Sequence, residues 1–233
     1  MERIKRILAV IFAISLIVVC FFNAMDILLY GIPDFIPKEY EKLGVAADVG
    51  VAREDLDQVS VEMMQYLKGS RELLSDIVTT IDGVPDTPFF NERECAHMAD
   101  VRSLFLRGMA LRRWCAVLCG VILVVLLLWD RKHIIELLSR GMITGTVIFF
   151  VAAGVIGIFA AVDFNAFWTV FHHLFFEGDT WLFDPRTSRM INMLPEQFFS
   201  DIVKYIILIF GAMLAVLLGL AAWGIHAAKK NKG

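Results

Sequence analysis

Three histidines lie in polar or interfacial stretches of the sequence, where an imidazole could take part in chemistry. His97 belongs to Cys95-Ala96-His97-Met98-Ala99-Asp100, and His172 and His173 begin an aromatic stretch over 171–185. A neutral imidazole, with a pKa of about 6.5, can accept a proton from an amine or return one to a leaving group. Asp100 would share a helical face with His97 and could orient its ring. This pattern predicts general acid–base catalysis, and interfacial hydrogen bonding is the plainer interpretation of any single histidine.

Two other chemistries would use the same residues. A cysteine–histidine nucleophile would need Cys95, but residues two apart on a helix point in different directions. A metal site could draw on the polar side chains of both stretches, namely His97, His172, Asp100, Asp179 and Asp184. No closely spaced pair such as His-x-x-x-His is present, and adjacent histidines alone are weak evidence. We therefore expect no metal and no cofactor, with both chemistries kept as alternatives.

The composition is that of an integral membrane protein. Of 233 residues, 58% are hydrophobic, and the mean hydropathy is +0.67, well above the usage of soluble domains. The net charge of −3 gives no reason to expect a nucleic-acid partner. Three of the four cysteines (Cys20, Cys115 and Cys119) fall in apolar segments, so no disulfide framework is predicted.

Four apolar segments are predicted to cross a bilayer, whose hydrocarbon core takes about 20 helical residues; the second is short, but Met109 to Leu111 can extend it while Arg112 and Arg113 snorkel. The predicted spans are 1–30, 114–129, 142–162 and 202–228, and the connecting segments are 31–113, 130–141 and 163–201. Trp114 and Trp129 bracket the second span, as interfacial anchors do. The predicted fold class is all-α integral membrane, with four transmembrane helices and a helical extracellular cap.

The placement of lysine and arginine predicts the orientation of the spans. Basic residues gather in three places: Arg3, Lys5 and Arg6; Arg131, Lys132 and Arg140; and Lys229, Lys230 and Lys232. Four spans put all three groups on one side, so both termini are expected in the cytoplasm and segments 31–113 and 163–201 outside. Arg102, Arg107, Arg112 and Arg113 would then lie outside, where they snorkel to the interface or contact lipid phosphates.

The first extracellular segment is predicted to be helical. Apolar residues recur at helical spacing in two sets, Leu56, Val59, Met63, Tyr66 and Leu67, and then Leu73, Leu74, Ile77 and Val78, which predicts two amphipathic helices broken near Gly69. Asp82-Gly83 and Pro85 to Pro88 mark turns. Asn91 followed by Glu94 predicts a reciprocal cap. A helix should therefore begin near Glu92, carry His97, and continue into the second span.

Aromatic residues crowd the second extracellular segment. They are Phe164, Phe167, Trp168, Phe171, Phe175, Phe176, Trp181, Phe183, Phe198 and Phe199. Aromatic belts are normal at a membrane surface, but ten aromatics in one segment exceed what anchoring needs. They predict a pocket for acyl chains, lined by Phe171, Phe175, Phe176, Trp181, Phe198 and Phe199, together with Tyr66 from the first segment.

Two stretches resemble the signatures of the bacterial lipoprotein intramolecular transacylase family. Residues 95–105 are similar to its His-Met-x-Asp-Val-Lys/Arg motif. Residues 171–176, with Asp179, Trp181, Asp184-Pro185 and Leu194-Pro195-Glu196-x-Phe198-Phe199, are similar to its second motif. The resemblance covers essentially the whole chain, including the four spans and the two extracellular segments.

The resemblance implies an acyltransferase of the bacterial cell membrane that needs no cofactor. Its substrate would be a lipoprotein whose N-terminal cysteine carries a thioether-linked diacylglyceryl group and a free amine. The sn-2 acyl chain would move to that amine and give the lyso-form lipoprotein. The catalytic residues would be His97 and His172, with no assigned role for His173. The supporting positions are Glu94, Asp100, Arg102, Asp179 and Asp184, and the expected partners are this lipoprotein and membrane lipids.

Two further functions fit the same features. A metal-dependent membrane hydrolase would use the same histidines and would be sensitive to chelators. A non-catalytic lipid- or lipoprotein-binding membrane protein would tolerate the loss of both histidines. A transporter is disfavoured, because the spans lack charged residues near the middle of the bilayer and show no pair of broken helices.

Overall fold

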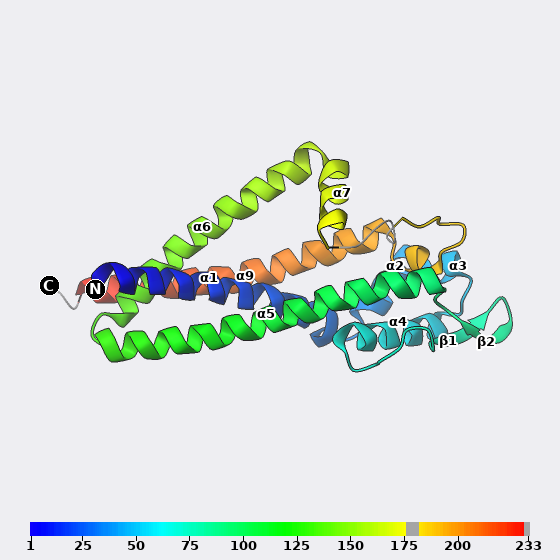
Figure 1. Ribbon diagram of the computed structural model, residues 1–233, viewed down its shortest axis with the longest axis horizontal. Coiled ribbons are helices and arrows are strands. Elements are labelled where there is room, and N and C mark those ends of the chain that lie inside the picture. Colours follow the sequence, from blue (N-terminus) through cyan, green and yellow to red (C-terminus); the bar gives the residue numbers. More distant parts are fainter. Residues whose placement is uncertain (176–181, 231–233) are drawn as a thin grey trace. The chain divides into compact units, whose positions relative to one another are not determined.

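The computed structural model (Figure 1) describes residues 1–175 and 182–230, with only the backbone described at positions 160, 161, 164, 165, 168 and 172. In chain order its elements are α1 (Glu2–Asp26), the π-helical turn η1 (Ile27–Gly31), α2 (Phe35–Leu43), α3 (Val45–Val49), α4 (Arg53–Lys68), β1 (Val78–Ile81), β2 (Val84–Pro88), α5 (Glu92–Asp130), α6 (Ile134–Val162), α7 (Phe164–Phe175), α8 (Arg189–Met193) and α9 (Glu196–Lys230).

The elements form two compact units. The first, here the span unit, comprises Met1–Asp26, Met109–Asn165 and Ile206–Gly233; the second, here the histidine unit, comprises Ile27–Gly108 and Ala166–Tyr205. The long helices α5 and α9 each contribute one part to both units.

Four helices of the described chain are long and apolar enough to cross a membrane: Glu2–Gly31, Glu92–Asp130, Ile134–Phe159 and Glu196–Lys230. The predicted class, an all-α membrane protein of four spans, is thereby confirmed. Most of the segment 130–141 is helical, since α6 begins at Ile134. Ile134, Leu137 and Leu138 pack in an apolar cluster with Ala9. These three residues have helical spacing, so the packing favours a helix that begins directly after the turn.

Small residues allow α1 and α6 to pack backbone against backbone within the span unit. Ala9 and Ala13 are fully buried. A methyl group added at Gly141 would lie 2.6 Å from the carbonyl carbon and oxygen of Ala9, and one added at Gly145 would lie 2.7 Å from the Cβ of Ala13. Small residues four apart on both helices are a recurrent means of close approach in membranes. The contact joins residues about 130 positions apart and has no local signal in the sequence.

The second half of α6 diverges from α1 and α9 (Figure 1). Its large side chains between 147 and 158 are mostly exposed, including Val147, Ile148, Phe150, Val151, Val155, Ile156 and Ile158. Phe149 keeps one contact to α9, with its ring centroid 5.6 Å from that of Phe210. This half of the helix therefore presents an apolar surface suited to lipid.

Arg112 has protein partners in the span unit. Its guanidinium forms an ion pair with the carboxylate of Asp26 and donates to the amide oxygen of Asn23 at 3.2 Å. From its position in the sequence, Arg112 was expected to snorkel to the interface or to contact lipid phosphates. Pairing with Asp26 instead neutralises a positive charge that the predicted orientation places at the outer surface.

The core of the histidine unit is built by residues from both of its chain segments. Leu56, Val59 and Met63 of α4 lie in one buried cluster with Phe89, Met98 of α5, Met193 of α8 and Phe198 of α9. The helix predicted from the spacing of Leu56 to Leu67, with a break near Gly69, is confirmed as α4, and so is the continuous helix from Glu92 into the second span.

One predicted helix is wrong. The residues after Gly69 form a loop and then an antiparallel hairpin, in which Val78 pairs with Pro88 and Ile81 with Val84. Asp82 and Gly83 at its tip both have positive φ, 52° and 79°, as the tightest hairpin turns require. The β-branched run from Val78 to Ile81 favours a strand, and this preference prevailed over an apolar spacing that also suited a helix.

Candidate active site

His97 lies in the second turn of α5, with its side chain half-buried. The ring of Phe183 packs edge-on against the imidazole, with centroids 5.4 Å apart and ring planes at 71°. Arg93, one turn earlier, places its guanidinium carbon 5.6 Å from the centre of the same Phe183 ring. Phe183 therefore covers one side of the His97 ring.

Glu94 ties the start of α5 to the segment that follows Phe183. Its side chain is completely buried. One carboxylate oxygen accepts from the backbone N–H of Asn91 at 2.8 Å, while the other accepts from Ser188 Oγ at 2.6 Å and from the N–H of Met190 at 3.0 Å. Asn91 Oδ1 accepts from the N–H of Glu94 at 2.9 Å, so the predicted reciprocal cap is confirmed.

Arg189 makes a second link between the same two segments. Its guanidinium donates to the carbonyl oxygens of Pro88 at 3.1 Å and Phe89 at 2.9 Å, at the end of β2 and three to four residues before α5 begins. Ser188 also caps α8 by accepting from the N–H of Ile191 at 3.3 Å. The start of α8 is therefore held to the start of α5 by two neighbouring side chains.

Asp184 shapes the turn that connects Phe183 to Ser188. Its carboxylate accepts from the guanidinium of Arg186, at 2.6 Å for the shortest contact, and its carbonyl oxygen accepts from the N–H groups of Thr187 and Ser188 at 3.0 Å. The Arg186 guanidinium lowers the pKa of Asp184. Asp184 thus contributes to the site by fixing the turn, since its described partners all lie within the turn itself.

Asp100 and Arg102 follow His97 on α5. Asp100 is half-buried, and its carboxylate makes no hydrogen bond or ion pair among the described residues. The guanidinium carbon of Arg102 lies 4.6 Å from the centre of the Tyr66 ring, and Arg102 donates to the carbonyl oxygen of Glu72 at 3.0 Å. Arg102 and Tyr66 therefore join α5 to α4 and the loop after it, with Tyr66 buried in the core.

The aromatic residues predicted to line an acyl-chain pocket lie in different settings. Phe171 and Phe175 pack on each other along α7, with ring centroids 5.0 Å apart. Phe198 is buried against Tyr40, at 5.4 Å between centroids, whereas Phe199 is exposed. Phe198 is therefore a core residue, and Phe171, Phe175 and Phe199 have more accessible positions.

Several predicted site residues cannot be placed in this geometry. Phe176, Asp179 and Trp181 lie outside the described residues, and His172 is described only through the backbone of α7. The side chain of His173 is exposed. Residues 166–175 of α7 and the first part of α5 belong to the histidine unit. His97 and His172 therefore lie in the same compact unit.

Sequence reasoning missed Phe183, Ser188 and Arg189 as parts of the site. Ser188 carries a local signal, because serine before a short helical run is a typical cap. No local signal indicates its bond to Glu94, which lies 94 residues away, and Phe183 was counted only as one aromatic among many.

The model of the family described as lipoprotein intramolecular transacylase Lit matches residues 10–199, most of the chain. The chain belongs to this family. It is accordingly an integral membrane acyltransferase of bacterial type. No curated protein matches the chain.

Solved structures of the lipoprotein intramolecular transacylase Lit from Bacillus cereus share the fold. One is 19% identical over 100% of both chains, with a TM-score of 0.72. A variant of that enzyme with one histidine replaced by arginine is 17% identical over 99% of this chain and 96% of its own, with a TM-score of 0.74. At such identities the likeness supports the fold, and the family match carries the activity.

Cys95 is a poor candidate for a nucleophile in this transacylase. It lies in the polar first turn of α5, partly buried. Burial raises the pKa of its thiol, and the negative charges of Glu94 and Glu92 raise it further. A catalytic thiolate needs the opposite, a lowered pKa, so the cysteine–histidine alternative is disfavoured.

Metal ligands do not converge in the part of the chain that the structure describes, where no three His, Cys, Asp or Glu side chains form a group that could hold an ion. The set named from the sequence also includes Asp179, which is outside this part, and His172, whose side chain is not described. The donor set that is described, His97 with Asp100 and Asp184, does not by itself make a site.

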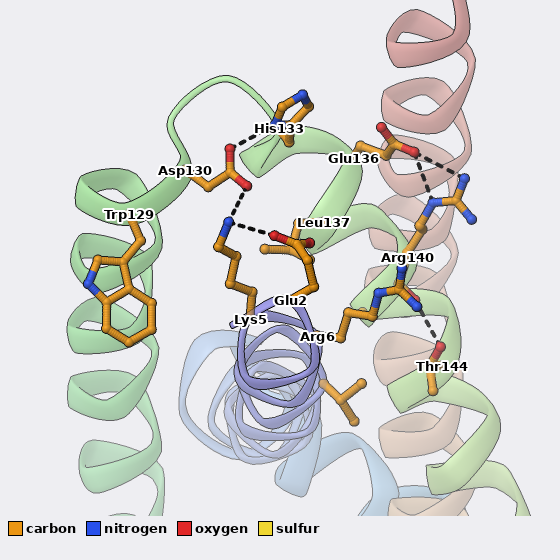
Figure 2. A pocket seen from close by; sticks show the side chains of 12 residues that line it. Glu2, Lys5, Arg6, Trp129, Asp130, His133, Glu136, Leu137, Arg140 and Thr144 are labelled. Carbon is orange, nitrogen blue, oxygen red and sulfur yellow. Dashed lines mark hydrogen bonds and ion pairs between the residues drawn. The ribbon is translucent and has the colours of Figure 1, made fainter.

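A hollow of about 850 Å³ lies in the span unit, at the start of α1 and beside the turn between α5 and α6 (Figure 2). Lys5 reaches across it to Asp130 at 2.7 Å and to Glu2 at 2.9 Å. Arg140 pairs with Glu136 at 3.0 Å. None of the predicted site residues lines this hollow, and its cations are largely matched by its own carboxylates, so we assign it no catalytic part.

Proposed function

We propose that the chain moves the sn-2 acyl chain of an S-diacylglyceryl group to the α-amine of the N-terminal cysteine in the same lipoprotein. The amine nitrogen forms a bond to the ester carbonyl carbon, and the bond from that carbon to the glyceryl oxygen breaks. The products are an amide and a free sn-2 hydroxyl, so the mass of the lipoprotein does not change. An ester becomes an amide, which requires no external energy source.

His97 and His172 would act as the general base and the general acid of this reaction. One imidazole accepts the proton that the attacking amine loses, and the other donates a proton to the departing glyceryl oxygen. Each such transfer is typically worth about 10²- to 10⁴-fold in rate. The enzyme needs no nucleophile of its own, because donor ester and acceptor amine are already held in one molecule.

The observation that carries this proposal is the setting of His97. Its imidazole is half-buried, the Phe183 ring packs against it in a T-shaped contact, and the compact unit that holds it also contains the part of α7 with His172. An aromatic cover excludes water, which would otherwise compete with the amine for the ester. The exposed aromatic rings of Phe175 and Phe199, with Phe171, offer apolar surface for acyl chains.

We also propose that the histidine unit lies at the extracellular face, with both termini in the cytoplasm. The three basic groups at the ends of the spans support this orientation. The division of the chain supports it as well, because the two segments expected outside, 31–113 and 163–201, correspond closely to the two parts of the histidine unit.

Tandem mass spectrometry of an N-terminal lipopeptide tests the reaction. The chain is expressed in cells that otherwise make only the diacylglyceryl form, and fragmentation locates each acyl chain. We expect one acyl chain on the amine at unchanged parent mass. A gain of one chain would indicate an external lipid donor, and a loss of one chain would indicate a hydrolase; either result would overturn the proposal.

Single substitutions test the two histidines. His97→Ala and His172→Ala should each abolish transfer while the protein remains folded. His173→Ala is the matched control, since its exposed side chain lies next to His172 on α7, and it should retain transfer. Activity in either of the first two variants would exclude the two-histidine mechanism.

A further inference from the structure

The segment from Phe183 to Met190 is fastened to the start of α5 at three successive points. Phe183 packs on the imidazole of His97, Ser188 and Met190 donate to the buried Glu94 carboxylate, and Arg189 donates to the carbonyls of Pro88 and Phe89. We infer that Ser188 and Arg189, acting through Glu94 and Phe183, are positioning residues that fix the ring of His97 for proton transfer. This inference rests on the proposed function of His97.

The Glu94 carboxylate is the centre of this arrangement. A carboxylate with no exposure to water is costly unless hydrogen-bond donors surround it, and here three donors come from two chain segments. Only the bond from Asn91 is local to the α5 cap. The other two hydrogen bonds come from Ser188 and Met190. The carboxylate therefore receives them only when segment 183–190 is in place.

Arg189 supplies an anchor of a different kind. Its Nη1 donates to the carbonyl oxygens of Pro88, the last residue of β2, and of Phe89, the next residue, and two acceptors for one nitrogen constrain its direction as well as its distance. With Ser188 bound to Glu94 at the start of α5 and Arg189 bound at the end of β2, these bonds oppose movement of the segment along the helix and around it.

Phe183 links the fixed segment to the imidazole of His97, because the two rings are in contact. The turn at Asp184 leads directly from Phe183 to Ser188, so fixing Ser188 fixes the aromatic ring. The second side-chain torsion of histidine is intrinsically broad, and the Phe183 ring, whose centroid lies 5.4 Å from that of the imidazole, limits this torsion from one side. A general acid or base must be aligned with the proton it exchanges, and misplacement by about 1 Å can cost about 10²-fold in rate.

The experiment compares steady-state kinetics on a diacylglyceryl lipopeptide for the intact protein and its variants in detergent. Ser188→Ala removes the donor to Glu94, and Phe183→Leu removes the ring while keeping an apolar side chain. We expect kcat to fall between about 10- and about 100-fold in both variants, with KM unchanged. Ser188→Thr, which keeps the hydroxyl, should restore most of kcat.

Ser60→Ala is the matched control. Ser60 is buried, and its hydroxyl donates to the carbonyl of Asp57 within α4 at 2.8 Å, so the change deletes a buried hydroxyl away from His97. It should leave kcat and KM unchanged. Wild-type kcat in both Ser188→Ala and Phe183→Leu would overturn the inference, and so would a rise in KM at constant kcat. If Ser188→Ala does not fold, Phe183→Leu alone decides.

A second measurement separates this inference from the proposed function, because it does not depend on turnover. The rate at which diethylpyrocarbonate modifies His97 is followed by peptide mass spectrometry. Ser188→Ala and Phe183→Leu should both raise this rate severalfold relative to wild type and to Ser60→Ala. An unchanged rate would overturn the positioning role even in an active enzyme, whereas a raised rate without acyl transfer in the wild type would leave positioning intact and reject the reaction.

Discussion

At the scale of single residues, the buried carboxylates of the histidine unit differ in their partners. The Glu94 carboxylate accepts hydrogen bonds from uncharged donors, whereas Glu39 and Asp201 form ion pairs with the same lysine. Lys42 Nζ lies 3.0 Å from a carboxylate oxygen of Glu39 and 2.7 Å from one of Asp201. Both carboxylates are buried, so removal of Lys42 would leave two like charges together in a poorly solvated place.

Lys42→Met should lower the melting temperature by an amount that depends on pH. Lys42, and then Gln197, lower the pKa of Asp201 by hydrogen bonding. A carboxyl whose folded pKa is lowered stabilises the folded state above its ordinary pKa, and this contribution is lost as pH falls through the lowered value. The gap between wild type and variant should therefore be large at pH 7 and narrow below about pH 4.

Differential scanning fluorimetry in detergent measures this gap. Lys38→Met is the control, because Lys38 is exposed on the same helix and forms no ion pair among the described residues. A gap that stays constant from pH 7 to pH 3 would contradict the assignment of the ion pair.

Cys95→Ala should keep the rate of acyl transfer close to that of wild type. The raised pKa of the thiol leaves little thiolate at neutral pH, and the proposed reaction forms no acyl-enzyme. Lipopeptide turnover with the purified variant measures it. A folded but inactive Cys95→Ala protein would return the covalent mechanism to consideration.

At the scale of elements, the contact between α1 and α6 depends on the absence of side chains. The helices approach until a Cβ at Gly141 would collide with the backbone of Ala9. Gly154 lies farther along α6, where an added Cβ would meet nothing within 4 Å. The same substitution at the two glycines therefore separates the effect of packing from that of helix propensity.

Gly141→Ala should destabilise the protein by about 1–3 kcal/mol, the usual cost of overpacking. Gly154→Ala should be neutral or slightly stabilising, because alanine favours helix by up to about 1 kcal/mol over glycine. Unfolding of both variants in a mixed detergent series measures the difference. Equal stabilities would show that α1 and α6 do not meet at Gly141.

At this scale, the features that were predicted from the sequence depend on residues close together in the chain, and most of those that were missed join residues far apart. The cap of α5 was predicted because Asn91 and Glu94 are three residues apart and their types suffice. The hairpin was missed because Leu73, Leu74, Ile77 and Val78 fit a helical spacing, although Asp82-Gly83 marked its turn correctly. The bond from Ser188 to Glu94 and the approach of Gly141 to Ala9 join residues distant in the chain, and one sequence without tertiary packing does not reveal them.

At the scale of the whole molecule, the chain alternates between two environments. Apolar stretches supply the span unit, and the stretches between them supply the histidine unit. The basic residues near the span ends favour the proposed orientation, because lysine and arginine are generally retained on the cytoplasmic side. The pairing of Arg112 with Asp26 removes one charge that would oppose this orientation.

Single-cysteine labelling tests the orientation. In a variant without the four native cysteines, Glu54→Cys in the histidine unit should react with a membrane-impermeant maleimide in intact spheroplasts. Lys132→Cys, in the turn between α5 and α6, should react only after lysis. The reverse pattern would place the candidate site in the cytoplasm and overturn the proposed orientation.

The close packing of α1 against α6 also has a consequence for the synthesis and insertion of the protein. During synthesis α1 emerges first, and its partner follows about 130 residues later. At about 5–20 residues per second, the first helix waits on the order of ten seconds in the lipid before the glycines that receive it exist. Throughout that delay the Gly141 and Gly145 partners of Ala9 and Ala13 are missing, and a ribosome that stalls before α6 leaves a fragment in which this face of α1 lacks them.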